Sequence, residues 1–258
     1  MANIEFSVSQ ALSESWALFK KNWLGLVVTY LIFSIALSVI GYGLFFLCAY
    51  LFVPDALQSY VAAVQSGNEA LMQQSQLAMQ WAGQPAFNLV SIVLTSIFLV
   101  GFIGNCLAMV RGTSNGIDGS CFNRPFSLYC KLLCLQFITS ILSVIGLLCC
   151  IVPGIYLMVK LSFVTTYQID HPDKGIVESI KGGWALTNGN FGNILLLILA
   201  EVGVMILGYC CCCIGMFAAV PICYLAVTSA YNTLLANVEP VVVAEATPVN
   251  ADNYSKQE

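Results

Sequence analysis

Two ionisable side chains, Lys160 and Glu201, stand about halfway along two long apolar stretches of the sequence. A charge at the centre of a membrane-spanning helix costs at least about 2.5–3.5 kcal/mol, so such a residue usually faces other helices and finds a partner. Consecutive antiparallel helices would bring both residues to the membrane midplane, and we therefore predict that they pair. The pair would be a structural ion pair, or it would couple protons or a substrate to transport. Alternatively, Lys160 would snorkel along a tilted helix.

Cysteine is the second residue type with chemical potential, since the chain has 12 of them. The weak candidates for a metal or thiol-redox site are Cys149, Cys150, Cys210 and Cys213, which we expect on one side of the membrane. Their spacing is not the paired spacing of zinc proteins. A buried cysteine acts chiefly as a small, soft packing residue. Packing is the favoured interpretation, and we expect neither a metal nor a cofactor.

Other catalytic groups are scarce. The chain has one histidine, His171, which excludes a histidine-based metal cage and is expected in a solvated turn formed by Asp170 to Asp173. No phosphate-binding loop or dinucleotide fingerprint is present, and the serines have no candidate base. We expect no enzymatic activity.

The amino-acid composition indicates whether the chain folds in water or in a membrane. Of 258 residues, 9% are charged and 59% are hydrophobic, against about 25% and 45–50% in average soluble domains. Such a chain cannot cover a water-soluble surface with charge. The net charge of −4 and the lack of a basic patch argue against nucleic-acid binding. The sequence therefore predicts an all-α, polytopic membrane protein with membrane lipids as partners.

A membrane span needs roughly 20 mostly apolar residues, and six stretches qualify. They cover about 23–53, 86–110, 125–150, 151–167, 191–212 and 215–236. The first would reach about 46 Å as a straight helix, so it must tilt, project or break near Gly41 and Gly43. We expect a tight turn at Pro153 and Gly154 between the third and fourth spans, or one bent or re-entrant helix.

Basic residues indicate the orientation. Eight of them fall on one side of these six spans, whereas the loop 54–85 contains none. The positive-inside rule then predicts that both termini are cytoplasmic in a bacterial inner membrane. The first residues lack a basic region before the apolar stretch, so we expect the first span to act as a permanent anchor rather than a cleaved signal.

Two amphipathic helices are expected, at 7–21 and 175–188, with Trp16 and Trp184 as interfacial anchors. The first would begin with a capping box of Ser7 and Gln10 and would lie in the interface or pack on the bundle. The pattern of the second repeats the first with a shift of 168 residues, which suggests an internal repeat.

The segments outside the spans and amphipathic helices have simpler predictions. The external segment 54–85 has helical spacing and would form a cap. The polar segment 239–258 is expected to be a disordered cytoplasmic tail.

The second half of the chain resembles known bacterial membrane proteins. The matching features are IVPGIYLMV at Ile151–Val159, Ser162 with Phe163, SIKGGWALTNGNF at Ser179–Phe191, and Pro221 with Tyr231. They are similar to six-helix proteins of the glycerophosphoryl diester phosphodiesterase membrane-domain and YciC-like families. The likeness covers roughly 125–238 well and 7–53 loosely, and Gly183 departs from the usual serine. It implies a helical inner-membrane protein and, for most members, no assigned activity; the catalytic domain of the fused members is lacking.

These observations lead to a main functional prediction and two alternatives. The chain is expected to be a non-enzymatic inner-membrane protein in envelope or lipid homeostasis, or a scaffold that binds a membrane-protein partner or a second copy of itself. The first alternative is a small transporter or channel that uses Lys160 and Glu201. The weaker alternative is a cysteine-rich metal or thiol-redox membrane protein.

Overall fold

The computed structural model describes residues 6–211 and 215–246, and the ordered elements among them are helices. The order along the chain is α1 (Val8–Phe52), α2 (Pro54–Ser66), α3 (Glu69–Val110), η1 (Gly119–Phe122), α4 (Phe126–Cys149), α5 (Ile151–Leu161), α6 (Val164–Asp170), α7 (Ile176–Leu186), α8 (Phe191–Cys210) and α9 (Met216–Ala246). The all-α prediction is confirmed for this part of the chain.

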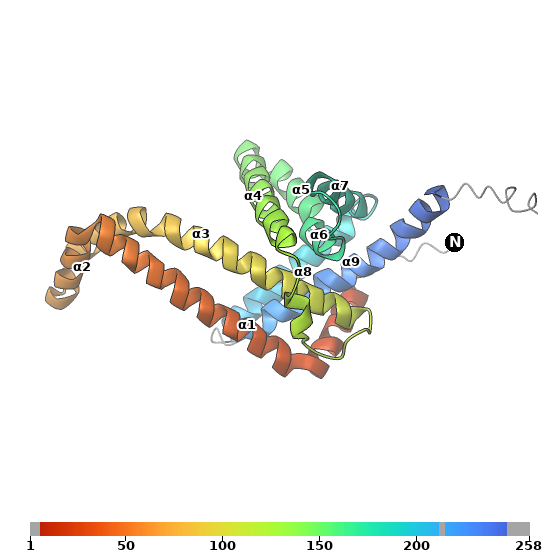
Figure 1. The fold of residues 1–258 in the computed structure, drawn as a ribbon, viewed down its shortest axis with the longest axis horizontal. Coiled ribbons are helices and arrows are strands. Elements are labelled where there is room, and N and C mark those ends of the chain that lie inside the picture. The colour runs from red at the N-terminus through yellow and green to blue at the C-terminus, as the bar shows by residue number, and fades with distance from the viewer. Residues whose placement is uncertain (1–5, 212–214, 247–258) are drawn as a thin grey trace, which may run out of the picture.

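The helices α1 and α3 form a long hairpin that projects away from the other helices and is closed by α2 at its tip (Figure 1). Glycines face phenylalanine rings across this hairpin: a Cβ on Gly41 would lie 2.7 Å from Phe87, and one on Gly83 would lie 2.5 Å from Phe45. α1 therefore runs unbroken through Gly41, and the expected break there is absent. The kink lies earlier, at Asn22, where φ is −123° and ψ is 17°.

Five helices among the described residues are long and apolar enough to cross a membrane, so the predicted count of six is not confirmed. These segments are Val8–Phe52, Glu69–Val110, Phe126–Gly146, Phe191–Cys210 and Met216–Val238. The expected span 151–167 is instead two short helices, α5 with 11 residues and α6 with seven. Eleven residues reach only about 16 Å, roughly half of the hydrocarbon thickness.

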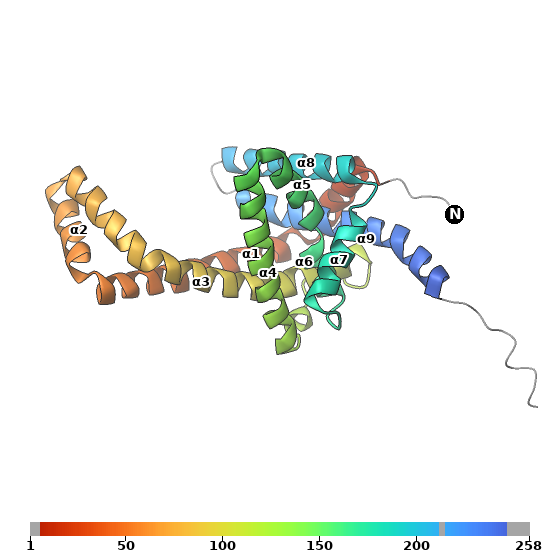
Figure 2. The same ribbon diagram turned by 90° about the horizontal axis from the view of Figure 1, so that it is seen from above.

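The turn between α4 and α5 lies at Cys150, whose backbone is extended with φ −176° and ψ 159°. Pro153 and Gly154 belong to the first helical turn of α5 and not to the connection between α4 and α5. Proline is tolerated there because its missing N–H would have had no intrahelical acceptor. α4 runs across the direction of α1 and α3 in both views (Figures 1 and 2), so these helices do not all run side by side.

The main core lies where α3, α6 and α9 meet. Val100, Phe163, Val164, Tyr231 and Leu234 are at most 1% exposed there. A second cluster joins α1 to α3 and α9 and contains Leu26, Phe98, Phe102 and Leu225. Burial of these side chains fixes the C-terminal half of α3 between α1 and α9.

The first 14 residues of α1, predicted as an amphipathic helix, are helical and pack on the bundle. Val8 and Ala11 belong to the main core, whereas Trp16 is 50% exposed. The predicted capping box is wrong, because Ser7 makes no side-chain cap and its hydroxyl lies 2.9 Å from that of Ser9.

The second amphipathic helix is α7, and the backbone supports the expected repeat. Asn190, 168 residues after Asn22, has φ −116° and ψ 18°, nearly the dihedral angles of Asn22. Asn22 is a kink within α1, and Asn190 is the N-cap of α8, four residues after the end of α7. The local sequence likeness is therefore also a likeness of backbone conformation.

α9 continues to Ala246, so the segment 239–246 is helical rather than disordered as predicted, and 247–258 lies outside the described residues. The start of α1 and the end of α9 lie on the same side of the molecule, opposite α2, in both views (Figures 1 and 2). The segment 54–85 forms α2 and the first part of α3, as the helical prediction required.

Candidate functional site

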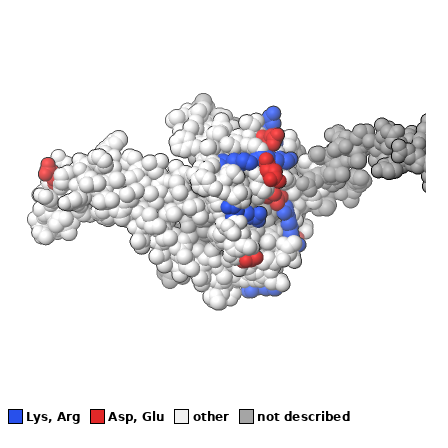
Figure 3. All heavy atoms as spheres, in the orientation of Figure 1, with Lys and Arg blue, Asp and Glu red and all other residues white. Residues whose placement is uncertain are grey.

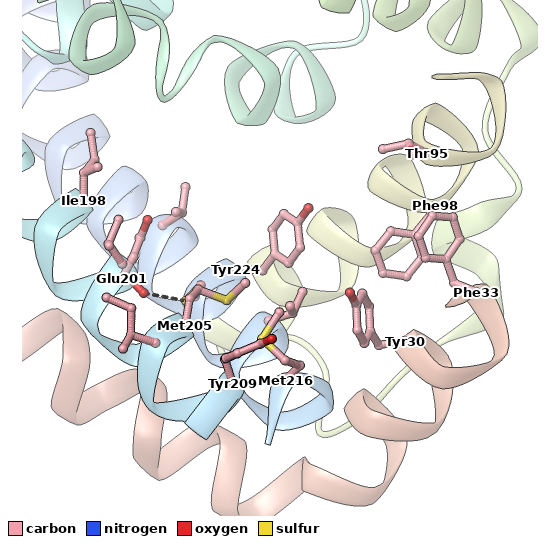
Figure 4. Close-up of a pocket in the computed structure, with 15 residues that line it drawn as sticks. Tyr30, Phe33, Thr95, Phe98, Ile198, Glu201, Met205, Tyr209, Met216 and Tyr224 are labelled. Carbon is pink, nitrogen blue, oxygen red and sulfur yellow. Dashed lines mark hydrogen bonds between the residues drawn. The ribbon is translucent and has the colours of Figure 1, made fainter. Parts of the chain in front are cut away.

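A groove of about 740 Å³ lies among α1, α3, α8 and α9 (Figure 4). Its lining includes Tyr30 and Phe33 from α1, Thr95 and Phe98 from α3, Ile198, Glu201, Val202, Met205, Ile206 and Tyr209 from α8, and Met216, Val220, Cys223, Tyr224 and Val227 from α9. The lining is almost entirely apolar or aromatic. Its volume falls within the range of about 300–1,000 Å³ that is typical of small-molecule sites.

Aromatic contacts hold one wall of the groove in place. Phe33 stacks on Phe98 at a centroid distance of 4.1 Å, and Tyr30 lies 6.0 Å from Phe98. These contacts tie α1 to α3. Stacked aromatic pairs add about 0.5–1.5 kcal/mol to the energy of burial, so this wall is fixed rather than adaptable.

Small residues bring α8 and α9 together at the other wall. A Cβ on Gly208 would lie 2.8 Å from the Cβ of Ala219 and 3.1 Å from the carbonyl oxygen of Gly215. Such close approach through small residues is the usual way in which helices pack in lipid. Ile206 and Tyr209 remain 58% and 67% exposed on the α8 side, so the groove opens to the surroundings of the helices.

Glu201 is the acidic member of the groove lining. Its Oε1 is buried and has no hydrogen-bond partner within the described ranges. Its backbone carbonyl is a distant acceptor for the Cys223 thiol, at 3.8 Å, the contact drawn dashed in Figure 4. A carboxylate that projects into an apolar groove with an unsatisfied oxygen can accept a hydrogen bond from an occupant.

Lys160 does not pair with Glu201, and that prediction is wrong. Its ammonium donates to Asn188 Oδ1 at 2.7 Å and lies 5.5 Å from the ring centroid of Trp184 and 5.7 Å from that of Tyr156. The ion pairs between described residues join Asp170 to Arg111 and His171, and none includes either member of the predicted pair. Lys160 lies in the last turn of α5, which is too short to carry it to the middle of a span.

Charged side chains gather on one part of the surface, whereas most of the α1–α3 hairpin is bare of them (Figure 3). Arg111 binds Asp170 through two hydrogen bonds of 2.7 Å. The Asp170 carboxylate also accepts from the Tyr231 hydroxyl at 2.8 Å. The network therefore links the end of α3 to α6 and α9.

The Asp170 carboxyl stays easily ionised. Burial opposes its charged form, but the hydrogen bonds from Arg111 and Tyr231 and the charges of Arg111 and His171 outweigh burial and hold its pKa below 3.8. The predicted turn is present at 172–174 and is exposed at Asp173, but Asp170 and His171 are partly buried. His171 is also packed, with its ring stacked on Tyr167 at 4.3 Å.

The cysteines form no metal site within the described ranges, where no group of three histidine, cysteine or acidic side chains could hold an ion. Cys150 and Cys210 are exposed free thiols. Cys213 and the side chain of Cys149 lie outside what the structure describes. Cys150 and Cys210, the two candidates whose side chains the structure describes, are therefore not joined by a disulfide.

Sequence reasoning found Glu201 but missed the aromatic wall opposite it. Tyr30 and Phe33 belong to the first span and Phe98 to the second, and each reads as an ordinary lipid-facing or core residue. Their meeting depends on how α1 and α3 cross α9. The spacing of residues along the sequence does not reveal how these helices cross.

Comparison with known proteins gives relatives without an assigned activity. The chain is 28% identical over 249 residues to an uncharacterised protein of Mycobacterium bovis. The aligned residues make up 95% of this chain and 73% of that protein. Uncharacterised proteins from two strains of Mycobacterium tuberculosis match with the same identity and coverage. No family model and no solved structure matches. Together with the five apolar helices, these findings are those of a helical, membrane-embedded protein.

Proposed function

We propose that this chain is a non-enzymatic inner-membrane protein of lipid or envelope homeostasis, and that it holds the apolar chain of a membrane amphiphile in the groove. The observation that carries the proposal is the groove itself: about 740 Å³, lined almost throughout by apolar and aromatic side chains and open beside α8. In a membrane, the molecules that reach such an opening are lipids, and an acyl chain matches its lining.

We also propose where the chain lies in the cell and how it is oriented in the membrane. We propose that α5 and α6 together complete a sixth, broken crossing, which places both termini in the cytoplasm. The basic residues on one side of six crossings support this location, as does the common side on which α1 starts and α9 ends. The resemblance of 125–238 to the phosphodiesterase membrane-domain and YciC-like families supports the inner membrane. Trp16 and Trp184 are proposed as interfacial anchors, and a membrane-protein partner or a second copy of the chain remains part of the proposal.

The test is retention of lipid by the purified protein. The full chain, extracted in a neutral maltoside detergent, is analysed by native mass spectrometry for bound lipid. Val220→Trp places an indole in the groove, and Val144→Trp places one on the surface of α4, where Val144 is 57% exposed. We expect bound lipid in the wild type and in Val144→Trp, and loss of most of it in Val220→Trp. Equal retention in all three proteins would refute the proposal. Size-exclusion chromatography shows whether each variant is folded, and Val227→Phe blocks the groove with a smaller change.

A transporter is the second candidate, and the unsatisfied oxygen of Glu201 favours it. This version differs from the one the sequence suggested, because Glu201 would act without Lys160. Reconstituted liposomes discriminate between the two candidates. Movement of a defined solute down its gradient, abolished by Glu201→Gln, would replace the proposal of a lipid-holding protein.

A further inference from the structure

We propose that the occupant of the groove is a lipophilic amine, with its protonated nitrogen at Glu201 and its hydrocarbon tail along the aromatic wall. This inference rests on the proposed function, since it names the chemical class of molecule that the groove holds. Three features of the groove support an amine: Glu201 Oε1 lacks a donor, no basic side chain pairs with Glu201, and the groove is polar at one end only.

The missing donor is the first feature. In its ionised form, which a bound cation would favour, the Glu201 carboxylate only accepts hydrogen bonds. A buried polar atom without a partner is rare because it is costly. Glu201 Oε1 is such an atom among the described residues. The groove supplies no backbone or side-chain donor to it, so an occupant with an N–H or O–H group would complete the site.

The missing positive charge is the second feature. No ion pair joins Glu201 to a basic side chain of the described segments. Lys160, the other charge in the apolar body of the molecule, is satisfied by Asn188 and two aromatic rings. An ammonium and a hydroxyl could both donate a charge-assisted hydrogen bond to a carboxylate, but only an ammonium also supplies the opposite charge that buried charges require. An ammonium head therefore fits Glu201 better than a hydroxyl head.

The shape of the groove is the third feature. Figure 4 shows Glu201 at one end, near Ile198 and Met205, and Phe33, Phe98 and Tyr30 at the other end, with Tyr224 between them. The faces of tyrosine rings attract cations as well as hydrocarbon. The groove is thus polar at one end and apolar along its length, which matches a molecule with a single cationic head and a long tail.

The test compares two ligands that share a tail and differ in the head: dodecylamine and 1-dodecanol. Binding of each to the full chain in maltoside detergent is measured by native mass spectrometry over a range of ligand concentrations. Glu201→Gln removes the charge and keeps the size of the side chain. Glu178→Gln is the matched control, since Glu178 is an exposed carboxylate on α7, remote from the groove lining.

We expect dodecylamine to bind the wild type and Glu178→Gln equally, and to bind Glu201→Gln about tenfold or more weakly, because a hydrogen bond to a charged group is lost. The affinity for 1-dodecanol should change by less than about threefold. Equal binding of amine and alcohol, insensitive to Glu201→Gln, would overturn the amine inference and leave the lipid-holding function intact. If neither ligand binds the wild type, both the amine inference and the lipid-holding function are overturned.

Discussion

Lys160 and Glu201 are a basic and an acidic residue among apolar helices, and their surroundings differ. Lys160 is 6% exposed and enclosed by Asn188, Trp184 and Tyr156. Glu201 faces an open groove with one carboxylate oxygen unsatisfied. An ionisable group whose hydrogen bonds are made within the protein stabilises packing. One with an unsatisfied atom beside a cavity can bind a ligand. The difference assigns structure to the region around Lys160 and binding to the region around Glu201.

The largest effect on stability is expected at the cage around Lys160. Trp184→Ala removes one wall of the cage and should lower the free energy of unfolding by about 2 kcal/mol, less than the 3–5 kcal/mol of a fully buried tryptophan. Trp16→Ala is the matched control at the equivalent position of the repeat, where Trp16 is 50% exposed and a loss of about 0.5 kcal/mol is expected. Thermal unfolding in detergent measures both. Equal losses would show that the cage adds nothing.

Gly183 should be nearly as sensitive, because it lets α7 lie close to α6. A Cβ there would lie 2.7 Å from Val164 Cα, so Gly183→Ala should cost about 1–3 kcal/mol through overpacking. Gly203→Ala in α8 is the control: nothing lies within 4 Å of its Cβ position, and the gain in helix propensity should stabilise by about 0.5–1 kcal/mol. A neutral Gly183→Ala would contradict the packing described for α6 and α7.

Asp170 gives a pH-dependent prediction of smaller size. Because its pKa is held below 3.8 in the folded state, its contribution is fully present above that value and is lost as pH falls through the lower folded value. Asp170→Asn should cost about 1–2 kcal/mol at neutral pH, since Arg111 is partly exposed and screened. The difference from the wild type should vanish at strongly acidic pH. A difference that is constant with pH would contradict the ion-pair account.

The smallest effect is the coupling between Lys160 and Glu201 themselves. Residues that share no partner add their effects within about 0.3–0.5 kcal/mol. Lys160→Met, Glu201→Gln and the double mutant should therefore form an additive cycle in unfolding free energy. A coupling above about 1 kcal/mol would show that the two charges interact after all, and it would remove the contrast on which the binding site depends.

The elements that follow from local patterns were predictable from the sequence. The apolar stretches, the helical loop 54–85 and the amphipathic helices at 7–21 and 175–188 all appear as helices. The two asparagines of the suggested repeat, Asn22 and Asn190, have similar backbone angles.

What failed depends on how helices meet. The break at Ser162 and Phe163 turns the expected fourth span into two short helices, and apolar composition alone does not reveal such a break. The pairing of Lys160 with Glu201 assumed two full-length antiparallel spans, whereas α5 has 11 residues. The aromatic wall of the groove joins residues from the first and second spans, so hydropathy could not find it.

The most direct test of the account is to find where a lipid tail lies on the protein. A phospholipid with a photoreactive diazirine in its acyl chain is incorporated with the full chain into lipid nanodiscs, and the labelled residues are mapped by mass spectrometry. The account predicts labelling concentrated on the groove residues of α8 and α9, such as Met205 and Val220, and loss of that labelling in Val220→Trp. Labelling spread evenly over the exposed faces of α1, α4 and α8, and unchanged by Val220→Trp, would contradict it.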